Sequence, residues 1–204
     1  MSFVGIFRAK GGLAAIADSK STIESLGRSE EDRQRHPNKL FTFPGGVAVT
    51  YGSNSIQTRR PSEIFSKKLF LEDIVTSYLQ RTPTLDANFF QLLLTYLSSE
   101  EANKEPIHFL IGRKIWDGNY QLEHHKIGCR YYGERILPPQ AHSLIGGDPR
   151  YCEDFEGLKG LHQISDPDLL RRSLVKQLAD LVHKYDKDTQ YNSVGGMIQS
   201  CTLI

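Results

Sequence analysis

The stretch GGLAAIADSKST, residues 11–22, decides the fold of this chain of 204 residues. Its glycine pair separates two short apolar runs, residues 3–7 and 13–17. Two β-like runs on either side of a glycine pair predict a hairpin. Because this hairpin would begin at Ser2, the N-terminus is expected to be part of the folded structure.

Beyond this hairpin the chain alternates between strand-like and helix-like patterns, and the polar residues 19–38 predict a surface loop. Short runs around turn sequences predict strands, whereas apolar residues spaced three and four apart predict helices. The further predicted elements are, in order, a hairpin of residues 39–43 and 47–51 around Pro-Gly-Gly, two helices between residues 61 and 101, a hairpin of residues 107–115 and 120–125 around Asp-Gly, a strand at 143–147, a helix that begins at Pro167 after the cap Ser165-Asp166, and a closing strand at 194–204. This order predicts an α+β class, with helices packed on antiparallel sheets.

Composition excludes several classes of protein. With 25 Lys+Arg against 24 Asp+Glu the net charge is +1, which argues against a nucleic-acid partner, because that binding needs clustered positive charge. The longest apolar runs are far shorter than the roughly 20 residues that span a membrane. The three cysteines form no CxxC motif and suit reduced thiols in the cytoplasm. The seven histidines lack ligand spacing, so we expect no metal and no cofactor.

Ser2 offers a specific chemistry at the start of the first strand. Because serine is small, Met1 is a good candidate for removal, which would leave Ser2 with a free α-amine that can act as base for its own hydroxyl. The pKa of an α-amine is about 7.7–8, so a useful fraction is neutral at cytoplasmic pH. With Met1 retained, the Ser2 nitrogen is an amide and cannot accept the proton. Taken alone, Met-Ser is simply a common translation start.

The wider pattern resembles the proteasome β-type subunits and their bacterial relative, the ATP-dependent two-ring peptidase. Residues 11–22 resemble the family's glycine turn, apolar strand and Asp-Ser-(Arg/Lys)-x-Thr signature. Residues 38–41 and 47–53 look like its lysine-bearing strand and the strand that ends in an Ala-Gly-(Ser/Gly) bend, and Val194-Gly195-Gly196 resembles its C-terminal pattern. The resemblance spans most of the chain and implies a four-layer αββα sandwich of the N-terminal-nucleophile hydrolase type, as a single domain of residues 1–204.

The resemblance also implies roles for individual residues. Asp18 and Lys39 correspond to the aspartate and lysine that set the electrostatics around the N-terminal nucleophile, where the lysine stabilises negative charge and the aspartate holds the lysine. Gly52 corresponds to the glycine whose backbone N–H faces the developing oxyanion. Without the resemblance, Asp18 and Gly52 would be ordinary turn residues and Lys39 a surface lysine.

Three positions depart from the family pattern. The proteolytic members use threonine as nucleophile, and here an ungapped alignment back from Asp18 places Ser2 there, whereas anchoring on Val4-Gly5 places Met1 there. Gly147 stands where the family usually has a serine. The family's Asp-x-x-Ser before the last glycine pair has no gapless match, although Asp188 and Ser193 could supply these supporting residues with a longer loop.

We therefore expect a hydrolase that cleaves peptide bonds through Ser2 after removal of Met1. Two alternatives remain open: a catalytically inactive proteasome-like assembly subunit that keeps Met1, and a small-molecule amidase on the same fold. The resemblance further implies self-association into rings, a peptide or unfolded-protein substrate, and an ATP-driven unfoldase as a candidate partner.

Overall fold

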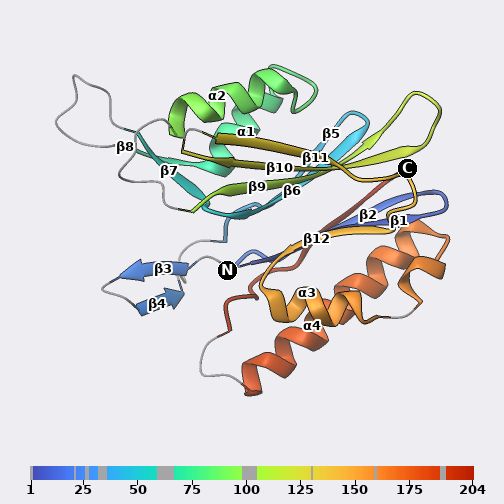
Figure 1. The fold of residues 1–204 in the computed structure, drawn as a ribbon. Helices are drawn as coiled ribbons and strands as arrows, with labels where there is room; N and C mark the ends of the chain where they lie inside the picture. The colour runs from blue at the N-terminus through green and yellow to red at the C-terminus, as the bar shows by residue number, and fades with distance from the viewer. Residues whose placement is uncertain are drawn as a thin grey trace.

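The computed structural model describes residues 2–20, 22–25, 28–31, 36–58, 67–97, 105–129, 131–158, 160–188 and 192–204, whose longer strands form two antiparallel sheets (Figure 1). The first sheet has the order β12-β1-β2-β13, and the second has the order β11-β10-β9-β6-β5. The strands of the first sheet are β1 (Phe3–Ala9), β2 (Gly12–Ala17), β12 (Ser143–Gly147) and β13 (Gln199–Leu203). Those of the second are β5 (Leu40–Phe43), β6 (Gly46–Gly52), β9 (Ile107–Lys114), β10 (Tyr120–Gly128) and β11 (Tyr131–Ile136).

The β1–β2 hairpin forms the centre of the first sheet. Its register runs from Val4 opposite Ala17 to Ala9 opposite Gly12, and nearly every side chain in it is buried. An added Cβ at Gly12 would collide with the main chain of Leu203, so glycine is needed where β13 passes β2. Strands buried on both faces in this way read as continuous apolar runs, as residues 3–7 and 13–17 do.

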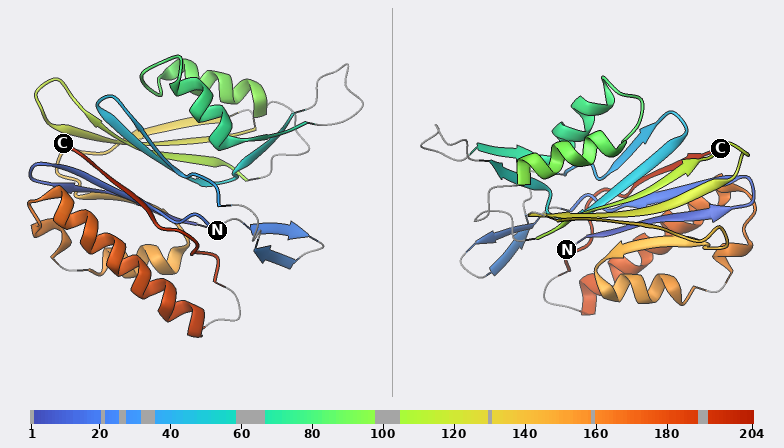
Figure 2. Two further views of the ribbon diagram at one scale, coloured as in Figure 1. Left: turned by 180° about the vertical axis from the view of Figure 1, so that it is seen from behind. Right: turned by 45° about the horizontal axis from the view of Figure 1, so that its top comes forward.

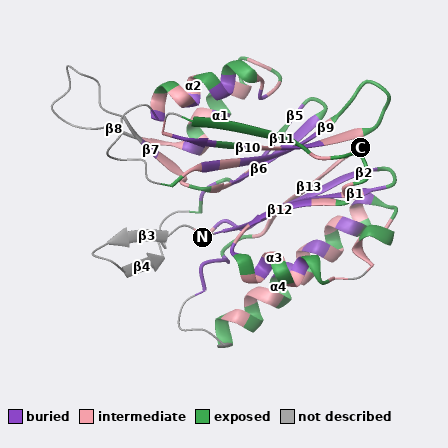
Figure 3. Ribbon diagram, in the orientation of Figure 1, coloured by how far each residue is buried: buried purple, intermediate pink, exposed green. Residues whose placement is uncertain are grey.

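Helices cover the outer face of each sheet (Figure 2). Helices α1 (Leu71–Leu79) and α2 (Ala87–Leu97) pack on the second sheet, and α3 (Pro149–Glu156) and α4 (Pro167–Asp188) pack on the first. A separate apolar cluster fills the space between the two sheets, with Ile6 and Leu110 among its buried members. Figure 3 shows the consequence, since the strands between the helices are largely buried while the outward helix faces are exposed.

The structure confirms the α+β class and the three predicted hairpins, and the predicted helix cap at Asp166 also forms. Its carboxylate accepts the N–H groups of Asp168 (2.8 Å) and Leu169 (3.4 Å). Within the described residues, no helix is both long enough and apolar enough to cross a membrane.

Two segments differ from expectation. The polar residues 19–38 contain a small hairpin, β3 (Thr22–Ser25) with β4 (Arg28–Glu31), because main-chain pairing does not require an apolar face. The apolar residues before Leu71 were expected to be helical, but β8 (Lys67–Phe70) pairs with β7 (Ser55–Thr58), which sets Leu69 opposite the buried Ile56. Residues 59–66, which belong to the same expected helix, lie outside the described residues.

Besides β3, β4 and β7, three further elements were not expected: β11, α3 and the short 3₁₀ helix η1 (Leu161–Gln163). Helix α3 begins at Pro149 directly after Asp148, whose side chain accepts the N–H of Arg150. This is the same Asp-Pro start signal that correctly located α4, but it introduces only 8 residues.

Candidate functional site

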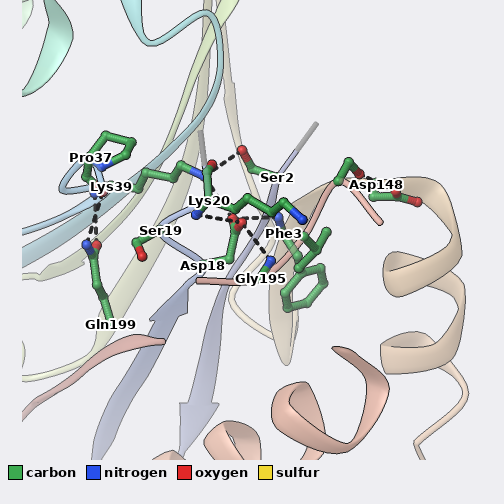
Figure 4. Close-up of polar contacts among 12 residues, drawn as sticks. Ser2, Phe3, Asp18, Ser19, Lys20, Pro37, Lys39, Asp148, Gly195 and Gln199 are labelled. Atoms are coloured by element: carbon green, nitrogen blue, oxygen red, sulfur yellow. Dashed lines mark hydrogen bonds and ion pairs between the residues drawn. The ribbon is translucent and has the colours of Figure 1, made fainter. Parts of the chain in front are cut away.

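Ser2, Asp18 and Lys39 meet at one end of the two sheets (Figure 4). Ser2 precedes β1 and Asp18 follows β2, so their antiparallel pairing brings both to the same end of the first sheet. Lys39 precedes β5 of the second sheet, and its side chain extends across to them. All three are buried, with exposures of 7%, 0% and 5%.

The Lys39 ammonium group has an acceptor for each of its N–H bonds. Its Nζ lies 2.8 Å from Ser2 Oγ, 3.0 Å from Asp18 Oδ1 and 2.7 Å from the carbonyl oxygen of Lys20. Since an ammonium group only donates, the Ser2 hydroxyl accepts here and keeps its own proton available for another acceptor. The lysine thus places a positive charge directly on the serine oxygen.

The Asp18 carboxylate is surrounded by donors. Oδ1 accepts the N–H of Phe3 (3.0 Å) as well as Lys39, and Oδ2 accepts the N–H groups of Lys20 and Gly195, each at 3.2 Å. Burial raises the pKa of Asp18 and lowers the pKa of Lys39, while their mutual attraction opposes both shifts. Because all of these neighbours donate, the ionised carboxylate is the form that fits the site.

The backbone of Ser2 and Phe3 is held by one hydrogen bond at each residue. The Asp18 N–H donates to the carbonyl of Phe3 at 3.0 Å, and the Asp148 N–H donates to the carbonyl of Ser2 at 2.7 Å. Gly147 has φ +116°, and an added Cβ there would collide with the Ser2 carbonyl. The residue that lacks the family's usual hydroxyl is therefore required to be glycine by the close approach of this backbone.

Of the two possible supporting residues, Asp188 and Ser193, the structure connects Ser193 to the site through Asp148. Ser193 Oγ donates to Asp148 Oδ2 at 2.7 Å, so the partner that the structure gives Ser193 is Asp148, and Asp188 ends α4. Burial tends to raise the pKa of Asp148, but hydrogen bonds from Arg150 and Ser193 outweigh it and hold that pKa below its ordinary value. Asp148 thus links Ser2, the start of α3 and the segment that leads to Gly195.

Gly52 is not hydrogen-bonded to this cluster among the described residues. It ends β6 opposite Ile107 with φ +88°, and an added Cβ would collide with the carbonyl of Pro106. Gly52 forms no hydrogen bond with Ser2, Asp18 or Lys39 among the described residues, although the Thr50 N–H two residues earlier donates to the Lys39 carbonyl at 2.9 Å. The structure therefore brings Ser2, Asp18 and Lys39 together and connects Gly52 to them through β6.

Two residues that hold the site were not identified from the sequence: Asp148 and Gln199. Gln199 Oε1 accepts the N–H groups of Lys39 (2.9 Å) and Leu40 (3.1 Å), and its Nε2 donates to the carbonyl of Pro37 at 3.1 Å. Gln199 and Lys39 are separated by 160 positions, and no local motif marks such a contact.

A second polar cluster lies on the outer face of the second sheet. Ligand-type atoms of Glu123, His125 and Glu134 lie within 4.8 Å of one another. Arg113 binds both oxygens of Glu123 (3.1 and 3.0 Å), and the two ring nitrogens of His125 contact Tyr132 and Glu123. These atoms already satisfy one another, so we interpret the cluster as an ion-pair and hydrogen-bond network.

Met1 lies outside the described residues, and with it the prediction that it is removed.

Neither protein-family models nor curated proteins give a match to the sequence. Among solved structures, the fold is similar to the Gly-1 mutant of Anbu from Hyphomicrobium sp. strain MC1, with a TM-score of 0.52 and 14% sequence identity, over 98% of this chain and 80% of that chain. Anbu is a bacterial proteasome-like protein of the N-terminal-nucleophile hydrolase type, so the similarity relates the two in fold.

Proposed function

We propose that this protein is a proteasome-like N-terminal-nucleophile hydrolase, with the four-layer αββα fold of that type, and that it cleaves peptide bonds through Ser2 after removal of Met1. The observation that carries the proposal is the buried contact of Lys39 Nζ with both Ser2 Oγ (2.8 Å) and Asp18 Oδ1 (3.0 Å). A buried ion pair usually adds little to stability, because the cost of removing both charges from water can exceed the energy of their attraction. A catalytic role therefore explains an ion pair buried against the Ser2 hydroxyl better than a purely structural one. The fold similarity to Anbu supports the same conclusion.

The proposed reaction begins when the free α-amine of Ser2 takes the proton from the Ser2 hydroxyl. Oγ then bonds to the carbonyl carbon of the substrate, the C–N bond breaks, and the amine leaves with the proton held by the α-amine. The acyl group remains on Ser2 as an ester. A water molecule gives a proton to the α-amine and attacks the ester carbon, after which the C–Oγ bond breaks and Oγ regains its proton.

The other residues act by electrostatics and position. Lys39 stabilises negative charge that develops on Oγ, and Asp18 keeps the ammonium group in place through a charge-assisted hydrogen bond. We assign the Gly52 N–H to the substrate oxyanion, a role that requires a close backbone approach. Asp148, bonded to Ser193, fixes the Ser2 carbonyl and thereby the direction of the nucleophile. Asp188 has no assigned step.

The resemblance to proteasome subunits extends the proposal to the assembly. We infer self-association into rings that enclose the sites, unfolded protein or peptide as substrate, and an ATP-driven unfoldase as partner. A cytoplasmic location agrees with the three free cysteines among the described residues.

The test combines the mass of the N-terminus with hydrolysis of a denatured protein and of a small amide. Ser2→Ala removes the hydroxyl but still permits removal of Met1, whereas Ser2→Thr keeps a hydroxyl and an amine. We expect turnover to fall about a thousandfold or more in Ser2→Ala and to persist in Ser2→Thr. Ser77→Ala, an exposed serine on α1, is the matched control and should be fully active.

Three results would overturn the proposal in different ways. Retention of Met1 in all natively expressed molecules would favour the inactive assembly subunit. Cleavage of the small amide by a monomer that leaves denatured protein intact would favour the amidase. Equal turnover by Ser2→Ala and the wild type would place the chemistry elsewhere in the molecule.

A further inference from the structure

Among the residues that the structure describes, strand β11 is an open edge of the second sheet. It pairs with β10 on one side, from Gly128 opposite Tyr131 to Glu123 opposite Ile136, and it is the last strand in the order of that sheet. All of its residues are exposed (Figure 3). Tyr131 (45%) and Ile136 (56%) are among the exposed large apolar side chains. Exposed aromatic and aliphatic side chains on an unpaired strand favour association with another strand.

The main-chain groups that face outward can be identified from the pairing. The Leu137 N–H donates to the Leu122 carbonyl at 2.9 Å, which continues the β10–β11 register by one pair. In an antiparallel ladder every second pair exchanges such bonds, so Tyr131, Gly133 and Arg135 direct their main-chain groups toward β10. The N–H and C=O groups of Tyr132, Glu134 and Ile136 therefore point away from the sheet.

The pairing of β10 with β9, on its other side, identifies the same main-chain groups. The Ile115 N–H donates to the Asn119 carbonyl at 2.8 Å, so the odd-numbered residues of β10 bond to β9 and the even-numbered ones are left for β11. This agrees with the pair formed by Leu122 and Leu137.

We propose that the occupant of this edge is β11 of a second copy of the chain, paired antiparallel about a two-fold axis at Gly133. A two-fold axis can oppose only residues of equal parity, because the outward groups lie on alternate residues. Registers centred on Gly133 or Glu134 give the greatest overlap of the two strands. Centring on Glu134 would set two carboxylates directly opposite each other, which is destabilising.

The register centred on Gly133 is complementary throughout. It opposes Tyr132 to Glu134 of the second copy, and these are the residues whose outward N–H and C=O groups bond across the axis. It also opposes Tyr131 to Arg135 of the second copy, a pair suited to a cation–π contact. Gly133 then occupies the closely spaced pair that exchanges no main-chain bonds, where open space surrounds it.

The other edge of the same sheet differs in a way that supplies a control. Strand β5 has only 4 residues, and the outward N–H of Leu40 is already bonded to Gln199. The Thr50 N–H donates to the Lys39 carbonyl, so by the same alternation the N–H of the exposed Thr42 also points outward. A proline at Thr42 and a proline at Glu134 therefore make equivalent changes at opposite edges.

Sedimentation velocity of the wild type, Glu134→Pro and Thr42→Pro tests the proposal without any need for hydrolysis. The wild type and Thr42→Pro should form particles that contain the two-fold pair, and Glu134→Pro should have about half their mass. A monomeric wild type, or equal masses for all three proteins, would overturn the proposal. Loss of peptide turnover in Glu134→Pro with unchanged mass would also overturn it and would assign the edge to substrate.

Amide hydrogen exchange of the wild type keeps the proposal testable if Glu134→Pro does not fold. The amides of Tyr132 and Glu134 should become at least about tenfold more protected as protein concentration rises, because only the second copy covers them. Those of Gly133 and Arg135, bonded to β10, should be protected at every concentration. Rates for Tyr132 and Glu134 that do not change with concentration would contradict the pairing.

Discussion

The side-chain oxygen of Gln199 lies 2.9 Å from the backbone nitrogen of Lys39 and joins the last strand of the first sheet to the segment that carries the buried lysine. The same side chain also bonds to Leu40 and Pro37. One residue thus bonds the lysine segment at three positions, Pro37, Lys39 and Leu40.

Replacement of Gln199 by alanine should displace Lys39 and lower kcat more than it changes KM. Loss of these hydrogen bonds should also reduce the free energy of unfolding by about 1–3 kcal/mol. Gln199→Glu keeps the acceptor for Lys39 and Leu40 and should recover part of the activity. Gln91→Ala, an exposed position on α2, is the control. Steady-state kinetics and urea unfolding check this, and an unchanged kcat in Gln199→Ala would contradict it.

Breaking the buried pair of Lys39 and Asp18 should strongly destabilise the fold. Lys39→Met leaves the carboxylate without its counter-charge, and a broken buried pair typically costs about 3–5 kcal/mol. The double variant Asp18→Asn with Lys39→Met should be less destabilised than the sum of the two single variants. Arg172→Met, which breaks an exposed ion pair with Asp168, should leave stability nearly unchanged. Additive effects in the buried cycle would mean that the two side chains do not interact.

Acid should weaken the contact between Asp148 and Ser193. Because the pKa of Asp148 is lower in the folded chain than in the unfolded chain, its contribution is complete above about pH 4 and is lost as the pH falls through the folded value. Ser193→Ala removes one hydrogen bond to the carboxylate and should cost about 1.5–3 kcal/mol at pH 7. The cost should shrink as Asp148 becomes protonated. Thermal unfolding between pH 2 and 7 measures it, and a cost that does not change with pH would contradict the prediction.

His108 should resist protonation. Burial, with the nearby His124 and Lys126, lowers the pKa of His108 to about 4, and its Nδ1 lies 2.9 Å from Nε2 of His124. Between pH 4 and the ordinary value near 6.5 the folded chain binds fewer protons than the unfolded chain, so stability falls as the pH drops through that range. His108→Phe should make this dependence shallower. An NMR titration of the imidazole protons that gave a pKa near 6.5 for His108 would refute the prediction.

Alanine at Gly52 should be worse tolerated than alanine at Gly118. Both glycines have positive φ (88° and 80°), so each substitution should cost about 1–2 kcal/mol of backbone strain. Only at Gly52 would the new Cβ collide with a neighbour, the Pro106 carbonyl, which should add about 1–3 kcal/mol. Gly118→Ala should keep full hydrolytic activity, whereas Gly52→Ala should lose it. Equal unfolding midpoints for the two variants would show that β6 moves freely away from Pro106.

The predictable parts of the fold were those in which a local signal coincides with burial. The β1–β2 hairpin has both a glycine turn and two buried apolar runs, and α4 has both a cap and a long apolar stripe. Strand β11 has neither, since all of its residues are exposed and no alternation marks it. Leu69 was assigned to a helix because its apolar character does not distinguish a helix from a short strand.

The residues of the candidate site also fall into two groups, those that a local sequence pattern identifies and those that it does not. Ser2, Asp18 and Lys39 could be named because they stand in recognisable positions of a family pattern, and the structure brings them together. Asp148 and Gln199 could not, because each acts through a contact between distant parts of the chain. Ser193 was named as a possible supporting residue, and its hydrogen-bond partner Asp148 could not be predicted because the two are 45 positions apart.

The order of strands in the first sheet has a consequence for biosynthesis. Strands β1 and β2 pair with β12 and β13, which are synthesised more than 120 residues later, and Asp18 accepts the N–H of Gly195. The first sheet and the environment of the buried carboxylate therefore cannot be completed until Gly195 and β13 have been synthesised. A nascent chain that still lacks these residues carries Ser2 without its finished surroundings, so the proposed hydrolysis could begin only after β13 is in place.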